Sequence, residues 1–123
     1  MIGEYIKAAS AKQFDWGTHD CSTFCADWRV SLGHDDPMAD IRGRYCDEES
    51  GLGLIYEGGG LLKLWSDRMP EPDKNPIAGA VGVIDVCDNI IGIFAGERWI
   101  FLGESGIRGV RVPPSKILRV WNG

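Results

Sequence analysis

The amino-acid sequence predicts an α+β fold in which N-terminal helices pack on a small antiparallel β-sheet. Residues 1–69 carry apolar side chains mainly at helical spacing, whereas residues 80–123 contain short apolar runs separated by Gly, Asp or Asn. Between them, residues 70–79 hold three of the six prolines and are expected to form a linker. Helices followed by a run of strands are typical of a single α+β domain.

Size and charge limit the classes of function. A chain of 123 residues with 44% hydrophobic and 25% charged residues is expected to form one domain whose core needs no disulfide or metal. Its net charge of −5 argues against a general electrostatic grip on nucleic acid or on an anionic membrane. We also expect no signal peptide and no membrane anchor, because the N-terminus lacks a basic segment followed by an apolar one.

The first half of the chain is expected to be helical in several short segments. Apolar spacing predicts a helix over residues 2–12, followed by a loop over residues 14–20. A second helix is expected from Cys21 to Gly33, capped by Asp20 or Ser22, with one apolar stripe formed by Cys21, Phe24, Cys25, Trp28 and Leu32.

Three further helix signals follow before the linker. Asp36-Pro37 has the capping carboxylate and the proline that commonly start a helix. Asp47-Glu48-Glu49 is an acidic segment that suits the first turn of another helix. Gly58-Gly59-Gly60 separates that helix from a short one around Leu61–Trp65.

The second half is expected to consist of strands joined by turns. The predicted strands cover residues 80–86, 90–95, 98–102 and 117–121. A loop is expected over residues 103–109, and Pro113-Pro114 is expected at a sheet edge or outside the sheet.

Cys21 is the residue best placed for chemistry. A thiol in the first turn of a helix lies near unpaired backbone N–H groups, which favour a thiolate and hence a nucleophile. The alternative is that Cys21 is a small buried residue on the same helix face as Phe24 and Cys25.

A nucleophilic thiol also needs a base, and the chain has only two histidines. His19 precedes Cys21 by two residues, so a tight turn would bring its ring near the sulfur; a surface or capping role is the alternative. His34 follows the far end of the same helix and is expected to lie distant from Cys21.

The four cysteines also permit a zinc or iron–sulfur interpretation. Cys21 and Cys25 are four residues apart on one helix face, and Cys46 and Cys87 are the other two candidates. Their spacing matches no common metal framework, so we expect free thiols, no metal site and no cofactor.

Asp20-Cys21-Ser22-Thr23-Phe24 is similar to the Asp-Cys-Ser-x-Phe signature of the NlpC-type, papain-like cell-wall cysteine peptidases. A set of phage tail-module domains related to those peptidases resembles the chain more closely. The shared features are Trp-Gly-x-x-Asp-Cys at residues 16–21, Gly-x-Asp-Pro at residues 33–37 with one extra Asp, and Arg-Gly-Arg-Tyr at residues 42–45. The resemblance implies a papain-like fold with the Cys helix packed on the sheet.

The resemblance also implies a degenerate active site. In the peptidases a His opens a His-Val-Gly-Ile-Tyr strand and acts as the base, and a polar residue on the next strand orients it. The matching run here is residues 90–94, so Ile90 stands at the His position and the orienting residue falls near Phe101. Neither side chain accepts a proton, so a structural role is expected, with Cys21 and His19 the catalytic candidates if activity is retained.

The segment Arg42-Gly43-Arg44-Tyr45 is a candidate binding or interface element. Its two guanidinium groups suit a phosphate or carboxylate, or they pair with Asp35, Asp36 or Asp40 to stabilise a turn. Arg and Tyr are also common in binding hot spots. Trp16 is a further interface candidate among the five tryptophans.

Taken with the resemblance, these features imply a structural component of a phage tail tip or baseplate, made in the bacterial cytoplasm and located in the virion tail. Its expected partners are other tail-tip or baseplate hub proteins, and peptidoglycan is a further possible partner. The alternative is an active cysteine peptidase that hydrolyses peptidoglycan stem peptides during cell-wall penetration.

Overall fold

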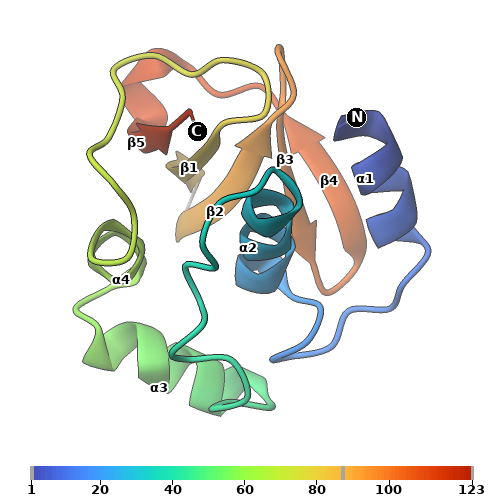
Figure 1. The fold of residues 1–123 in the computed structure, drawn as a ribbon, viewed down its shortest axis with the longest axis vertical. Helices are drawn as coiled ribbons and strands as arrows, with labels where there is room; N and C mark the ends of the chain where they lie inside the picture. The colour runs from blue at the N-terminus through green and yellow to red at the C-terminus, as the bar shows by residue number, and fades with distance from the viewer. Residues whose placement is uncertain (1, 87, 123) are drawn as a thin grey trace.

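A computed structural model describes residues 2–86 and 88–122, with helices in the first half and strands in the second (Figure 1). The helices are α1 (Ile2–Ser10), α2 (Cys21–Ser31), α3 (Glu48–Glu57), α4 (Leu61–Ser66) and the short 3-10 helix η1 (Pro114–Lys116). The strands are β1 (Val81–Val86), β2 (Asp88–Phe94), β3 (Trp99–Gly103), β4 (Gly106–Val110) and β5 (Ile117–Trp121). This order confirms the predicted α+β class.

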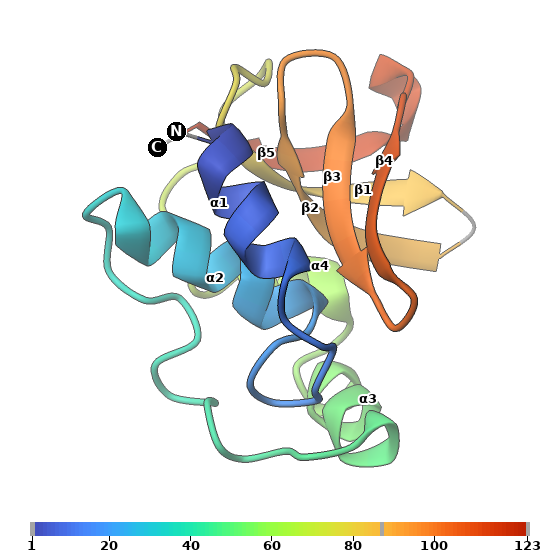
Figure 2. The same ribbon diagram turned by 90° about the vertical axis from the view of Figure 1, so that its right-hand side faces the viewer.

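The five strands form one antiparallel sheet in the order β4-β3-β2-β1-β5. The β1–β2 hairpin is paired from Val81↔Ile93 to Val86↔Asp88, whereas β2 and β3 pair only at Ile93↔Ile100 and Phe94↔Trp99. The two hairpins therefore diverge beyond that point, and Figure 2 shows β1 and β5 running across the direction of β3 and β4.

The sheet has a separate apolar cluster on each face. The larger cluster joins the helices to the sheet through residues such as Phe24, Trp28, Ile91 and Ile93. The smaller cluster lies on the far face and is formed by Ala80, Ile84, Trp99 and Val120 together with partly buried neighbours. Trp99 is 1% exposed in this cluster, and its ring lies so close to Gly82 of β1 that a Cβ at that position would be 2.6 Å from it.

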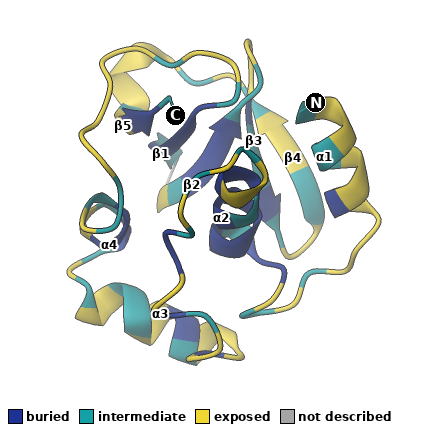
Figure 3. Cartoon of the chain, viewed as in Figure 1, coloured by how far each residue is buried: buried dark blue, intermediate teal, exposed yellow. Residues whose placement is uncertain are grey.

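Helix α2 is the centre of the first cluster and is mostly buried, whereas α3 lies at the periphery and is largely exposed (Figure 3). Both helices begin with a capping box: Asp20 accepts from the Thr23 backbone N–H, and Asp47 accepts from that of Ser50. Asp20 is therefore the cap of α2, one of the two residues predicted for that role. Helix α1 lies beside β4 and covers the edge of the sheet (Figures 1 and 2).

Two predictions about local structure were wrong. Asp36 does accept a hydrogen bond from the Met38 N–H, but the following residues form successive turns instead of a helix. Several of these turns are closed by bonds between residues three apart, such as Ala39 N–H to the Asp36 carbonyl and Ile41 N–H to the Met38 carbonyl, and the segment ends at Gly43, whose φ is 79°. The segment 103–109 is also not a loop, since most of it is β4, which pairs with β3 through a two-residue turn closed by Gly103↔Gly106.

Within residues 2–86 and 88–122, no helix is long and apolar enough to cross a bilayer.

Candidate functional site

A pocket lies at the N-terminus of α2, between that helix, the segment after Asp36, α3 and α4. The pocket opens to solvent, and the roughly 480 Å³ of space free of protein atoms beside its walls includes part of that solvent. Of the residues predicted from the sequence, the pocket wall brings together three: Trp16, Cys21 and Tyr45. The rest of its wall is largely apolar and is contributed mainly by Met38, Ile41, Leu54, Ile55, Leu64 and Trp65.

The loop before α2 positions the residues at the base of the pocket. Asp15 and His19 exchange two backbone hydrogen bonds of 2.8 and 2.9 Å, which close the loop into a tight turn around Gly17. The turn directs the Gly17 N–H to a carboxylate oxygen of Asp20, at 2.8 Å. The loop is therefore tied to the start of α2 through a single buried side chain.

Asp20 is the hub of this arrangement and is 1% exposed. One carboxylate oxygen accepts from the Thr23 N–H at 2.9 Å, and the other accepts from Gly17 and from the Tyr45 hydroxyl at 2.6 Å. Burial and the hydrogen bond to Asp20 raise the pKa of Tyr45, so this hydroxyl stays protonated and acts as a donor. Asp20 thus holds together the loop, α2 and the Arg42–Tyr45 segment.

The Cys21 thiol is at the start of α2, but its surroundings disfavour the thiolate. Burial raises the pKa of Cys21 to about 11; the Asp20 carboxylate acts in the same direction, and hydrogen bonds from Ser22 only partly oppose them. A thiol with this pKa is protonated at neutral pH, so it is a weak nucleophile without a base to remove its proton.

Neither histidine lines the pocket in the part of the chain that the structure describes. His19 is 8% exposed, and its Nε2 donates to the Ala9 carbonyl oxygen at 2.9 Å. It therefore ties the end of α1 to the loop before α2. His34 follows the opposite end of α2, an 11-residue helix that is about 16 Å long. The position of His19 therefore fits a structural role and not the role of a catalytic base.

The two strand positions expected to carry the base and its partner lie on the far side of the sheet. Ile90 packs against the second cluster, around Trp99. Ile100 and Leu102 contact the first cluster, so the intervening Phe101 points to the opposite face. Both side chains therefore face away from α2, and the family-based position of the base does not coincide with the pocket.

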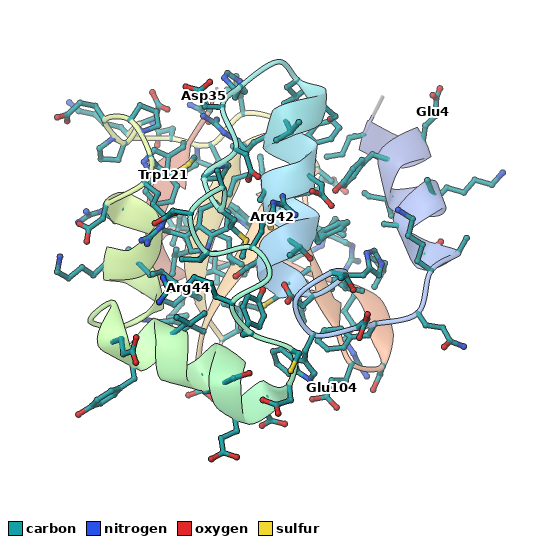
Figure 4. All side chains as sticks on the ribbon, turned by 60° about the horizontal axis from the view of Figure 1, so that its bottom comes forward. Glu4, Asp35, Arg42, Arg44, Glu104 and Trp121 are labelled. Atoms are coloured by element: carbon teal, nitrogen blue, oxygen red, sulfur yellow. The ribbon has the colours of Figure 1, made fainter. Side chains whose placement is uncertain are left out.

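The two predicted arginines have different surroundings (Figure 4). Arg42 forms ion pairs with Asp36 at 2.6 Å and with Asp27 at 2.7 Å, so it stabilises the turn segment against α2. Partial burial raises the pKa of Asp36, but the hydrogen bonds and charge of Arg42 outweigh it and leave that pKa below its ordinary value. Arg44 is exposed, so of the two only it has the surface position of an interface residue.

Sequence reasoning missed most of the pocket wall. Met38 and Ile41 lie three residues apart in the turn segment, and Leu54 and Ile55 face inward from α3. Their apolar spacing was the available signal, but it indicates only a buried face and not the element that lies opposite. Arg68, at the edge of the pocket, was also missed.

The thiols do not assemble into a metal site in the described residues, where no group of three or more His, Cys, Asp or Glu side chains has suitable geometry. Cys25 is fully buried on α2, and Cys46 is exposed. Cys87, the fourth candidate, lies outside the described residues.

Comparison with known proteins gives one match. Neither the curated proteins nor the solved structures contain a significant match to the chain. A family model described as "Domain of unknown function (DUF6950)" matches residues 1–122. The chain therefore belongs to this family.

Proposed function

We propose that this protein is a structural component of a phage tail tip or baseplate, with an NlpC-type, papain-like fold and a degenerate active site. The proposal that the active site is degenerate rests on the environment of Cys21. Its thiol has the helix-terminal position of a nucleophile, but burial keeps it protonated and its neighbour His19 is bonded to the Ala9 carbonyl. The tail assignment is supported by the ordered motifs at residues 16–21, 33–37 and 42–45.

The fold also supports this proposal. Helix α2 begins at Cys21 and packs on β2 and β3, the layout implied by the resemblance. The Arg42–Tyr45 motif stabilises this arrangement, since Tyr45 bonds to Asp20 and Arg42 pairs with Asp27 of α2. Arg42 and Tyr45 thus have structural roles around the thiol, and these roles explain the motif without a catalytic function.

Two measurements test this function. Phage-like particles purified from the bacterium that encodes the chain should contain it at a constant ratio to the other tail proteins, as measured by quantitative mass spectrometry. Its absence from intact particles would contradict the proposal.

The purified protein should also release no new amino groups from peptidoglycan fragments. Release that disappears in Cys21→Ala but persists in Cys46→Ala, a variant of an exposed thiol outside the pocket, would establish the alternative, an active cysteine peptidase.

A further inference from the structure

We propose that the outward face of α3 docks an apolar segment of another protein, one that carries Lys or Arg beside its apolar side chains. This face consists of exposed residues of the helix: Glu48, Glu49, Leu52, Gly53, Tyr56 and Glu57. It lies opposite the residues of α3 that line the pocket, and it is a property of the chain whether or not the chain belongs to a phage tail. Exposed apolar side chains, an excess of carboxylates and an exposed helical glycine support the proposal.

Two large apolar side chains are exposed on the outward face of α3. Tyr56 is 86% exposed and Leu52 is 51% exposed. They are four residues apart and therefore lie side by side on the helix surface. Leu54 and Ile55 point the other way and line the pocket, so α3 is apolar on both sides although one side is open to solvent (Figure 3). A helix that only covers a domain is typically polar on its outer face, and adjacent exposed apolar side chains indicate a surface that meets a partner.

Carboxylates surround this apolar pair. Because successive residues of an α-helix are about 100° apart, Glu49 falls beside Tyr56, while Glu48 and Glu57 lie at the two edges of the outward face. Helix α3 contains neither Lys nor Arg. None of the ion pairs found among the described residues involves these carboxylates. The apolar side chains of this face are therefore exposed in a locally negative environment.

Two glycines lie within the turns of α3, and contacts inside the protein explain only the first. A Cβ at Gly51 would stand 3.2 Å from the Tyr45 ring and 3.5 Å from the Trp16 ring, so close packing accounts for this glycine. A Cβ at Gly53 would meet no atom of the described residues within 4 Å, and Gly53 is exposed on the same face as Tyr56. A glycine in the middle of a helix destabilises it relative to alanine. At Gly53 the missing side chain instead lets the backbone of a partner approach α3 closely.

The charge of the outward face selects its partner. A second copy of the chain would bring the same carboxylates against α3, and an anionic membrane or a nucleic acid would also add negative charge, so all three are disfavoured. Lys or Arg beside an apolar side chain complements both features, because the cations meet the carboxylates while Leu52 and Tyr56 are covered. Tyr is also one of the residue types that contribute most to binding in protein interfaces.

A displayed peptide library tests this assignment with the purified full chain. Yeast cells display short random peptides composed of Leu, Tyr, Ser, Gln, Lys and Glu, and the clones that bind the chain are enriched and sequenced. The enriched peptides should contain Lys severalfold more often than Glu next to their apolar residues. Enrichment without this preference, or no more enrichment than from a library that lacks Leu and Tyr, would overturn the proposal.

Matched variants test whether the enriched peptides bind to α3. Tyr56→Ser and Leu52→Ser should each weaken their binding about tenfold, because each variant removes an apolar contact at the centre of the face. Ile77→Ser changes an apolar side chain that is 60% exposed on another segment, so it should leave binding unchanged. Equal losses at position 77 and on α3 would overturn the assignment to this helix.

A second pair of variants separates the charge of this face from the net charge of the chain. Glu49→Gln should weaken the binding of Lys-containing peptides severalfold in low salt, and the effect should shrink in high salt. Glu71→Gln removes the same charge from an exposed position outside α3 and should have little effect. Equal effects of the two variants would show that the peptides respond to the whole chain, and would overturn the proposal.

Gly53→Ala should affect stability and binding in opposite directions. The variant should raise the urea midpoint, because alanine favours the helix, and weaken peptide binding severalfold, because its Cβ occupies the point of closest approach. Unchanged binding would refute the role of Gly53. Light scattering of the purified chain tests the second copy as the occupant: a dimer that Tyr56→Ser dissociates would overturn the proposal. Absence of the protein from particles would refute the proposed function and leave these binding results standing.

Discussion

Replacing Asp20 with Ala should destabilise the protein far more than the same change at a capping residue that faces water. Loss of a helix cap costs about 1 kcal/mol. At this site the Tyr45 hydroxyl and the Gly17 N–H also lose their acceptor, and each unsatisfied group adds about 1–3 kcal/mol. The expected total is roughly 3–7 kcal/mol, a large share of the stability of a domain this size.

Urea denaturation followed by circular dichroism measures this loss. With a typical m-value of about 1.5–2 kcal/mol/M, the midpoint should fall by about 2–4 M. Asp47→Ala is the matched control, because it removes the same capping box from exposed α3 and should cause a smaller shift. Tyr45→Phe should fall between the two, since it removes one bond and leaves the cap intact. If Asp20→Ala lowers the free energy of unfolding no more than Asp47→Ala, the buried hydrogen bonds of Asp20 do not stabilise the protein beyond the helix cap.

Three further predictions concern the thiol, the loop and the second core. The alkylation rate of Cys21 should rise with pH up to about 11, and at pH 8 its thiolate fraction should be about one hundredfold below that of a free thiol. A midpoint near 8 would contradict the account of its burial. Since this pKa is raised in the folded state, the stabilising contribution of Cys21 should be complete below the unfolded pKa and decline as pH rises toward 11. Gly17→Ala should lower the urea midpoint more than Gly33→Ala. Both glycines have a φ of 92°, but only at position 17 would an added Cβ overlap the Tyr45 carbonyl oxygen. Equal shifts of the two variants would show that this overlap does not destabilise the protein. Trp99→Ala should cost about 3–5 kcal/mol in calorimetry because it empties the far-face cluster; a loss below 1 kcal/mol would show that this cluster contributes little.

The sequence predicted the fold class, the start of α2 and its cap because each depends on local signals. Helical spacing, the Asp-Cys junction and the following apolar stripe act within a few residues of one another. The acidic start of α3 at Asp47 is a similar case. Strand β4 was missed because its glycines and Arg108 resemble a loop, while its pairing with β3 and its cover by α1 involve residues that local patterns do not connect.

The candidate site could be predicted only in part. The sequence identified Cys21, Trp16 and Tyr45, which do meet at the pocket. The sequence does not show whether His19 acts as a catalytic base or has a structural role, because the Ala9 carbonyl oxygen that accepts from its ring belongs to helix α1. The face occupied by Ile90 likewise depends on strand register, since a shift of one residue reverses the side to which every side chain points.

The narrow pairing between β2 and β3 has a consequence for how the chain folds. Strands β1 to β4 form two hairpins from neighbouring residues, and such units form in about 1–10 μs. Strand β5 must instead return across the intervening hairpins to pair with β1, and α2 must dock from the other half of the chain. We therefore expect the slow step to be the joining of these distant segments, so that substitutions in β5 slow folding more than equally destabilising ones in α3. Folding is therefore expected to comprise a fast local phase, in which the hairpins form, and a slower phase of assembly.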